Sequence, residues 1–218
     1  MNYYHEIITE KSFKFLQELK KIYRFILIGG WAVFLYSHSL KSKDIDIIVD
    51  YSELAKLKEN YGVSKNDRLK KYEIKTGEFD VDIYLPHYSD LGVDIEEIQK
   101  NSIVREGFVV PDLERLFLLK LFAFSQRRGS TKGRKDELDI FSLVVLPEFN
   151  WENYKILAAD LGFEKYRRLF LDLLNSTVSV EELGFNEQKF SKIKKQIKRL
   201  LKNGEYRYGI LRSDEYCV

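Results

Sequence analysis

Two short stretches of the sequence place aspartates at alternate positions among apolar residues. They are "DIDIIVD", residues 44–50, and "DVDIY", residues 80–84. In a β-strand, residues i and i+2 face the same side, about 6.5–7 Å apart, so each stretch would present paired carboxylates. If the two strands are neighbours, these carboxylates repel one another unless a cation lies between them, and Mg²⁺ takes such oxygen ligands. The pattern favours a metal and phosphate site, and its alternative is a half-exposed strand with solvated acids.

A glycine pair precedes the first acidic stretch. Gly29 and Gly30 follow the apolar run "YRFILI" and lead into the apolar segment "WAVFLYS". Between a strand and a helix, glycines let the backbone approach a ligand, and the helix N-terminus directs N–H groups toward an anion. Most lone glycine pairs are only turns, but this pair stands before two acid-bearing strands, which favours phosphate binding.

These residues must be positioned by a small set of strands and helices. We expect a first helix at 5–21 and a helix at 51–62. The expected strands are 23–28, 44–50, 70–76 and 78–86, with the last two forming a hairpin around Gly77. After Pro111 nearly everything has helical period, with helices expected at 112–127, 134–146, 151–161, 163–175 and 187–202 and a basic loop at 127–136. The sequence therefore predicts an α+β domain over 1–110 and a helical domain over 111–218.

Composition adds few constraints on partners. The chain has 218 residues, 44% of them hydrophobic, which is ample for a folded core. Lys and Arg number 36 against 34 Asp and Glu, so nucleic-acid contacts would have to come from local patches. The only cysteine, Cys217, excludes an internal disulfide and suits a reducing compartment. Without a long apolar stretch or a signal-peptide pattern, we expect a soluble cytoplasmic protein that does not enter a membrane.

The order of these motifs resembles a known signature. An apolar strand, the glycine pair, a helix, "SKDIDIIV" and later "VDIYL" are similar to the hG[GS]…DhD pattern of the polymerase-β-type nucleotidyltransferase superfamily. The resemblance implies that superfamily's fold, a small mixed β-sheet flanked by helices, followed here by a helical C-terminal domain. It also implies that Gly29 and Gly30 face the triphosphate of an NTP.

The same resemblance implies a metal site and its ligands. Asp44, Asp46 and Asp82 would be catalytic and would hold two Mg²⁺ or Mn²⁺ ions. Asp82 is preferred as the third carboxylate because the superfamily pattern places that acid just before an apolar strand end, as in "DIYLP". Asp80 remains the substitute.

A second resemblance lies downstream. Residues 111–144, "PDLERLFLLKLFAFSQRRGSTKGRKDELDIFSLV", are similar to AbiEii-like, or MenA-like, nucleotidyltransferases, which include toxins of toxin–antitoxin systems. The resemblance implies functional roles for Lys120 and for Asp136 of the "KDELD" motif, and it covers about residues 25–146. Relatives often carry Arg four residues before the first metal aspartate, whereas this chain has Leu40 there, with Lys41 and Lys43 nearby.

The residues themselves leave two readings of this helical segment open. Lys120 interrupts the apolar run "LFLLKLFAF", so it either faces solvent on an exposed stripe or is buried against an anion. Asp136 and Asp139 share a helix face, either as a helix-start cap or surface pair, or as partners of Lys120 or Arg127 across a helix hairpin.

Further candidates concern nucleotide and acceptor binding. The candidate nucleotide-binding residues are Gly29, Gly30, Ser42, Lys120, Arg128 and Lys132. The helix at 187–202 carries six Lys and one Arg from residue 189 onward without an acid; it is either a solvated face or a guide for a phosphate backbone. His38 is expected near the site as a hydrogen-bonding residue, and Asp50 is expected to face water.

The function expected from these residues and from the superfamily resemblance is Mg²⁺-dependent transfer of NMP from an NTP. The resemblance to AbiEii-like proteins implies RNA, such as a tRNA 3′ end, or a protein hydroxyl as acceptor, and it implies a toxin with a cognate antitoxin. The alternative is a catalytically quiet module that binds nucleotide or RNA, or a partner subunit. A small-molecule nucleotidyltransferase of the aminoglycoside-modifying kind would need an acidic pocket for a cationic acceptor, and the basic loop and basic last helix speak against it.

Overall fold

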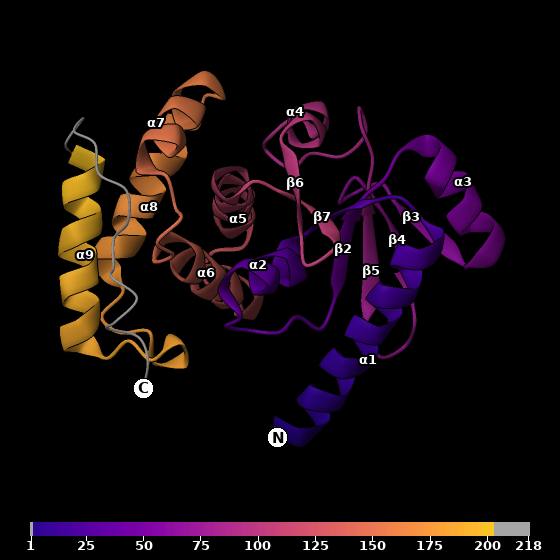
Figure 1. The fold of residues 1–218 in the computed structure, drawn as a ribbon, viewed down its shortest axis with the longest axis horizontal. Helices are drawn as coiled ribbons and strands as arrows, with labels where there is room; N and C mark the ends of the chain where they lie inside the picture. Colours follow the sequence, from indigo (N-terminus) through magenta and orange to yellow (C-terminus); the bar gives the residue numbers. More distant parts are fainter. Residues whose placement is uncertain (1, 203–218) are drawn as a thin grey trace. The chain divides into compact units, whose positions relative to one another are not determined.

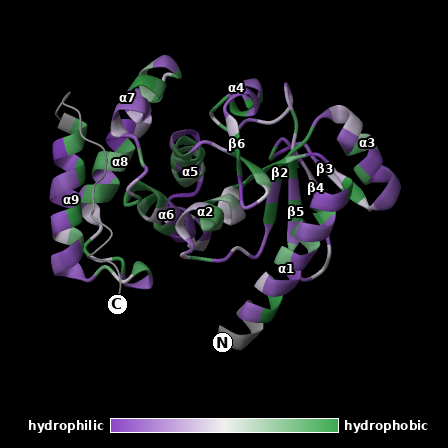
Figure 2. Ribbon diagram, viewed as in Figure 1, coloured by the Kyte–Doolittle hydropathy of each residue, from purple (hydrophilic) through white to green (hydrophobic). Residues whose placement is uncertain are grey.

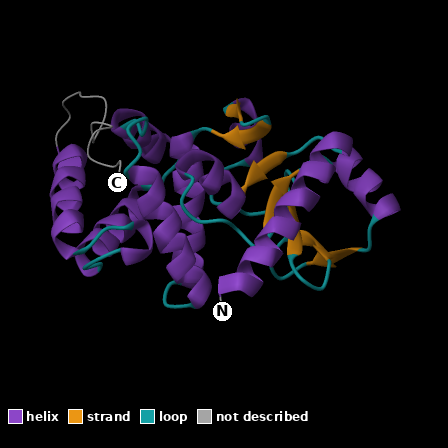
Figure 3. Ribbon diagram, turned by 60° about the horizontal axis from the view of Figure 1, so that its bottom comes forward, coloured by secondary structure: helices purple, strands orange, loops and turns teal. Residues whose placement is uncertain are grey.

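The computed structural model describes residues 2–202. The chain divides into two compact units, Met1–Asp112 and Leu113–Val218, each described by itself below (Figure 1). The named strands of the described chain all belong to the first unit, and the second is built from helices (Figure 3). Cys217 lies outside the described residues.

The first unit contains a five-stranded mixed sheet in the order β1-β2-β5-β4-β3. The strands are β1 (Ile26–Ile28), β2 (Ile45–Ile48), β3 (Val63–Asn66), β4 (Lys71–Lys75) and β5 (Asp80–Tyr84). β2 and β5 are parallel, and the other neighbours are antiparallel. The predicted α+β class, with a small mixed sheet and flanking helices, is confirmed.

Alternation along the central strands separates an apolar face from an acidic face. Ile45 and Ile47 of β2 and Val81 and Ile83 of β5 are fully buried. The intervening positions of the same strands carry acids, so those side chains point to the opposite face. Hydrophobic colour follows these strands and the helix α2 (Gly29–Ser37) in Figure 2.

Helices complete the first unit's core. Besides α2 they are α1 (Asn2–Ile22), α3 (Tyr51–Asn60) and α4 (Ile95–Lys100). α1 packs through aromatic rings, with Phe13 4.9 Å from Trp31 and Phe15 5.6 Å from Phe79 between ring centroids. Asp50 is exposed, as expected, but it also has a structural role, because its carboxylate accepts the Glu53 N–H at 2.8 Å and caps α3.

Four elements of this unit were not predicted. These are β3, α4 and the hairpin of β6 (Ser102–Arg105) and β7 (Phe108–Pro111). The hairpin turns at Glu106 and Gly107, whose φ angles of 49° and 78° are both left-handed, as a two-residue hairpin turn requires. The Glu-Gly pair is a weaker turn signal than Asn-Gly, so "SIVREGFVVP" did not read as two strands.

The second unit packs its helices around aromatic side chains. The helices are α5 (Leu113–Arg127), α6 (Thr131–Val144), α7 (Trp151–Asp160), α8 (Glu164–Ser176), the 3₁₀ turn η1 (Glu181–Leu183) and α9 (Glu187–Lys202). The Phe117 ring centroid lies 5.1 to 5.3 Å from those of Phe149, Tyr154 and Phe170. None of the helices within residues 2–202 is both long and apolar enough to cross a membrane.

The predicted basic loop at 127–136 is too long. α6 begins at Thr131 rather than at 134, because the Ser130 hydroxyl accepts the Gly133 N–H at 3.0 Å and caps the helix. The connection between α5 and α6 is therefore the short turn 128–130. Gly133 is needed where the helices meet, since a Cβ atom there would lie 2.3 Å from the Arg127 carbonyl oxygen.

Candidate active site

The sheet register brings carboxylates from three strands into one row. Asp46 of β2 is paired with Asp82 of β5, and Asp82 is paired with Glu73 of β4. Paired residues on adjacent strands lie about 4.8 Å apart and share a face of the sheet. The two acidic strands are therefore neighbours, as the predicted site requires, and the row is extended by an acid that sequence analysis did not name.

Asp44 lies immediately before β2 and is fixed by two hydrogen bonds. Its Oδ1 accepts the backbone N–H of Asp80 at 3.2 Å, and its carbonyl oxygen accepts the Ser42 hydroxyl at 3.0 Å. Ser42 is buried, so its side chain supports the bend that carries Asp44 rather than presenting a hydroxyl to solvent. Asp80 follows the same face of β5 and is paired with Lys75, whereas Asp82 is paired with the acid Glu73.

Gly29 packs directly on Asp46. Ile28 is paired with Asp46 in the sheet, and Gly29 follows as the first residue of α2 with a φ of 68°. A Cβ atom on Gly29 would lie 2.1 Å from Asp46 Oδ2 and 2.8 Å from Asp46 Cβ, so only glycine fits. Ile28 gives no side-chain cap, and the first N–H groups of a helix lack intrahelical partners. The N-terminus of α2, which is the positive end of the helix dipole, thus lies beside the Asp46 carboxylate.

A lysine sits among these acids. Lys71 Nζ lies 2.6 Å from Asp82 Oδ2 and 3.0 Å from Glu73 Oε1, and Glu73 Oε1 also accepts Asn66 Nδ2 at 3.0 Å. The side chains of Lys71 and Asp82 are only 11% and 14% exposed. Sequence analysis missed Lys71 and Glu73. The available signal was the alternation of Lys71, Glu73 and Lys75 on a strand expected to form a hairpin with the acidic one.

The electrostatics of the row follow from burial and charge. Burial, and after it the charge of Asp46, raises the pKa of Asp82 to about 6, although Lys71 acts in the opposite direction. Burial lowers the pKa of Lys71, but its contacts with Asp82 and Glu73 outweigh burial and the net shift is upward. Carboxylate oxygens suit Mg²⁺ or Mn²⁺, yet within residues 2–202 no three acidic, His or Cys side chains are grouped to hold a metal ion.

The "KDELD" acids form a buried cluster within the second unit. Lys120 Nζ lies 2.6 Å from Asp139 Oδ2 and 3.4 Å from Asp136 Oδ1, while Arg127 Nη2 donates to Asp136 Oδ1 at 2.8 Å. The Lys120 side chain is 7% exposed and both aspartates are 1% exposed. Of the alternatives weighed, the pairing across the α5–α6 hairpin is therefore present, and neither a helix-start cap nor an exposed lysine stripe is. Burial raises the pKa of Asp139 although Lys120 opposes it.

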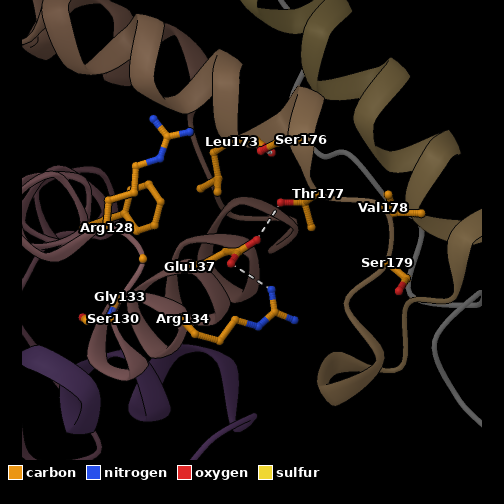
Figure 4. A pocket seen from close by; sticks show the side chains of 12 residues that line it. Arg128, Ser130, Gly133, Arg134, Glu137, Leu173, Ser176, Thr177, Val178 and Ser179 are labelled. Carbon is orange, nitrogen blue, oxygen red and sulfur yellow. Dashed lines mark hydrogen bonds and ion pairs between the residues drawn. The ribbon is translucent and has the colours of Figure 1, made fainter.

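The α5–α6 turn opens onto a cavity of about 510 Å³ in the second unit. Figure 4 shows Arg128, Ser130, Arg134 and Glu137 among its lining side chains. Arg134 Nη2 is held by Glu182 at 3.0 Å, and Glu137 accepts the Thr177 hydroxyl at 2.6 Å. Arg128 and Lys132 are both exposed, Arg128 at the turn and Lys132 in the first turn of α6.

Two other predicted features take separate positions. His38 ends α2 in a left-handed conformation with φ of 50°, at the opposite end of the helix from Gly29, and its Nε2 lies 3.3 Å from Glu106 Oε1. The expectation that His38 lies near the site is therefore wrong.

α9 buries Phe190, Ile193, Ile197 and Leu201 and exposes Lys192, Lys195 and Arg199 on another side. Figure 2 shows this mixture of hydrophobic and hydrophilic residues along α9.

Comparison with known proteins finds likeness in structure alone. No protein-family model matches the chain, and no curated protein matches it. A proposed nucleotidyltransferase from H. pylori is 17% identical with a TM-score of 0.49, covering 91% of this chain and 97% of its own. An antigenic nucleotidyltransferase-like protein from Paracoccidioides brasiliensis is 17% identical with a TM-score of 0.39, covering 81% and 96%. The STING-associated CdnE c-di-GMP synthase from Capnocytophaga granulosa is 17% identical with a TM-score of 0.31, covering 91% and 82%. Each TM-score is below 0.5, so the function has to be argued from the residues.

Proposed function

We propose that this chain is a nucleotidyltransferase, which moves a nucleoside monophosphate from a nucleoside triphosphate to an acceptor and releases pyrophosphate. The observation that supports it is the register of Asp46 with Asp82, with Gly29 at the start of α2 packed on Asp46. Carboxylates beside a helix N-terminus offer ligands for a cation and N–H groups for an anion in one place. Transfer from a triphosphate needs both.

In this proposal each residue has a defined part. When bound, Mg²⁺ or Mn²⁺ on Asp44 and Asp46 supplies positive charge to the triphosphate and the acceptor oxygen. The N–H groups at Gly29 and Gly30 bind phosphate oxygens. Asp82 takes the proton from the acceptor hydroxyl, whose oxygen bonds to the α-phosphorus. The bond from that phosphorus to its bridging oxygen breaks, and pyrophosphate leaves with the electron pair.

The second unit contributes by structure and by charge. Lys120 and Asp136 hold the α5–α6 hairpin together. Its turn carries Arg128 and the first turn of α6 carries Lys132, and we propose that both bind phosphate groups. The resemblance to AbiEii-like proteins supports RNA, such as a tRNA 3′ end, or a protein as acceptor. It also supports a cytoplasmic toxin with a cognate antitoxin.

The test offers each labelled NTP, with Mg²⁺ or Mn²⁺, to the purified chain together with total RNA or total protein. One fraction should retain the label. Asp46→Asn should lower the labelling at least 100-fold, because the amide removes a charged ligand. Asp50→Asn is the matched control and should label normally, since Asn also caps helices well. A folded wild-type chain that labels neither fraction with any NTP would contradict the proposal.

A module that binds nucleotide or RNA without chemistry is the second candidate, and the ion pair of Lys71 with Asp82 favours it. In such a module Asp82 needs no catalytic role, and Lys71 only has to neutralise its charge. Titration calorimetry separates the two candidates. Binding of NTP that requires Mg²⁺ and disappears in Asp46→Asn, without any turnover, would favour the module.

A further inference from the structure

The third carboxylate of the candidate site already has a cation bound to it. Lys71 reaches across from β4, and its Nζ lies 2.6 Å from Asp82 Oδ2. The same Nζ lies 3.0 Å from Glu73 Oε1, so the ammonium bridges two acids that are paired in the sheet register. The contact is largely shielded from solvent, because both the Lys71 and the Glu73 side chains are 11% exposed.

We infer that Lys71 takes the place of a second divalent ion, so that the site holds one Mg²⁺ or Mn²⁺ on Asp44 and Asp46 while Lys71 neutralises Asp82. This inference rests on the proposed function, and it departs from the resemblance, which implies two ions shared among three carboxylates. A charge-assisted hydrogen bond of 2.6 Å occupies Oδ2, one of the two Asp82 oxygens that could bind a second ion. An ammonium at that oxygen also repels a divalent cation.

The surroundings hold Lys71 where it is. Glu73 is also held by Asn66 Nδ2, which donates to the same oxygen, Oε1, at 3.0 Å. Lys75 adds positive charge 3.8 Å from Glu73 Oε2. The bridge therefore belongs to a packed network on β3, β4 and β5 and is not a single mobile side chain.

Lys71 acts as a positioning residue in this arrangement. By donating to Oδ2 it fixes the orientation of the Asp82 carboxylate and directs Oδ1 to the acceptor hydroxyl. Its charge also balances the acids of the row when one metal ion is bound instead of two. The number of bound ions is therefore the property that separates this role from a purely structural ion pair.

The test counts Mn²⁺ ions bound per chain, using electron paramagnetic resonance of the metal-free full-length protein titrated with Mn²⁺ alone. We expect one ion in the wild type and one in Lys71→Arg, which keeps the charge. In Lys71→Gln we expect a second ion, bound with a Kd at least tenfold lower than any second binding in the wild type. Circular dichroism checks the fold of each variant.

Equal numbers of Mn²⁺ ions in the wild type and Lys71→Gln, whether none, one or two, would overturn the inference. If Lys71→Gln does not fold, the double variant Lys71→Gln with Glu73→Gln removes the bridge and leaves Asp82 as the one acid of the bridge without its ammonium, and it should gain the second ion in the same way. Labelled NTP transfer is measured separately. If the wild type transfers nucleotide and binds two Mn²⁺ ions, this inference alone is overturned. If the wild type binds one Mn²⁺ ion but transfers no nucleotide, the proposed function is contradicted.

Discussion

The backbone of Gly29 lies so close to Asp46 that a Cβ atom on the glycine would sit 2.1 Å from Oδ2, 2.6 Å from Cγ and 2.8 Å from Cβ of the aspartate. Rotating the carboxylate away would not remove the last of these clashes, so the strand or the helix would have to move. The glycine at position 29 is therefore required by packing on the acidic strand, whether or not a ligand binds there. A sequence motif that is usually interpreted through phosphate binding here has a second cause in packing.

Gly29→Ala should consequently destabilise the chain by about 2–4 kcal/mol, from positive-φ strain together with overpacking. Gly77→Ala is the matched control, because Gly77 also has a positive φ, of 89°, but nothing lies within 4 Å of its Cβ position. The control should lose only about 1–2 kcal/mol. Urea unfolding of both variants measures the difference, and equal losses would show that the contact with Asp46 contributes nothing.

The two acids of β5 should differ in their effect on catalysis. Asp82 is paired with Asp46, whereas Asp80 is paired with Lys75 and contacts Asp44 through its backbone N–H. We expect Asp82→Asn to lower labelled transfer by about 100-fold or more, a typical cost of losing a general base. Asp80→Asn keeps the backbone contact and should lose less than about tenfold. The reverse order would identify Asp80 as the third carboxylate.

Much of the site could be predicted from the sequence because its signals are local. Alternating acids at Asp44 and Asp46, and at Asp80 and Asp82, indicate their face of the strand, and Gly29 marks the turn before the helix. The sequence could not show which residues of neighbouring strands are paired. The position of Lys71 between Asp82 and Glu73 depends on the register of β4 with β5, which a period of two leaves open to shifts by two residues.

In the second unit, the sequence likewise could not show which face of a helix is buried against its neighbour. The run "LFLLKLFAF" left Lys120 either exposed or buried, because helical period alone does not reveal which side a neighbouring helix covers. The start of α6 at Thr131 places Asp136 and Asp139 in the helix interior, facing Lys120. A Ser130 cap followed by Thr-Lys-Gly is a poor match to the usual capping signature, since the position three residues after the cap is Gly133 instead of Glu or Gln.

The raised pKa of Asp82 predicts how stability depends on pH. A carboxyl group whose folded pKa is about 6, against 3.8 unfolded, contributes stability that is complete below pH 3.8 and lost as the pH rises through 6. Without divalent ions, the wild type should therefore gain about 2 kcal/mol relative to Asp82→Asn between pH 7 and pH 4. Parallel urea unfolding across this range measures the difference, and a difference independent of pH would contradict the shift.

The buried cluster of the second unit should matter far more to stability than its exposed ion pairs. Lys120→Met leaves Asp136 and Asp139, both 1% exposed, without their shared ammonium. Removing one partner of a buried pair costs about 3–5 kcal/mol. Glu182→Gln removes a pair with Arg134 whose side chains are 45% and 40% exposed, and such pairs contribute about 0–1 kcal/mol. Thermal unfolding of both variants tests the contrast. If Lys120→Met unfolds like Glu182→Gln, the cluster does not stabilise the α5–α6 hairpin, and a role for Lys120 outside the fold would gain support.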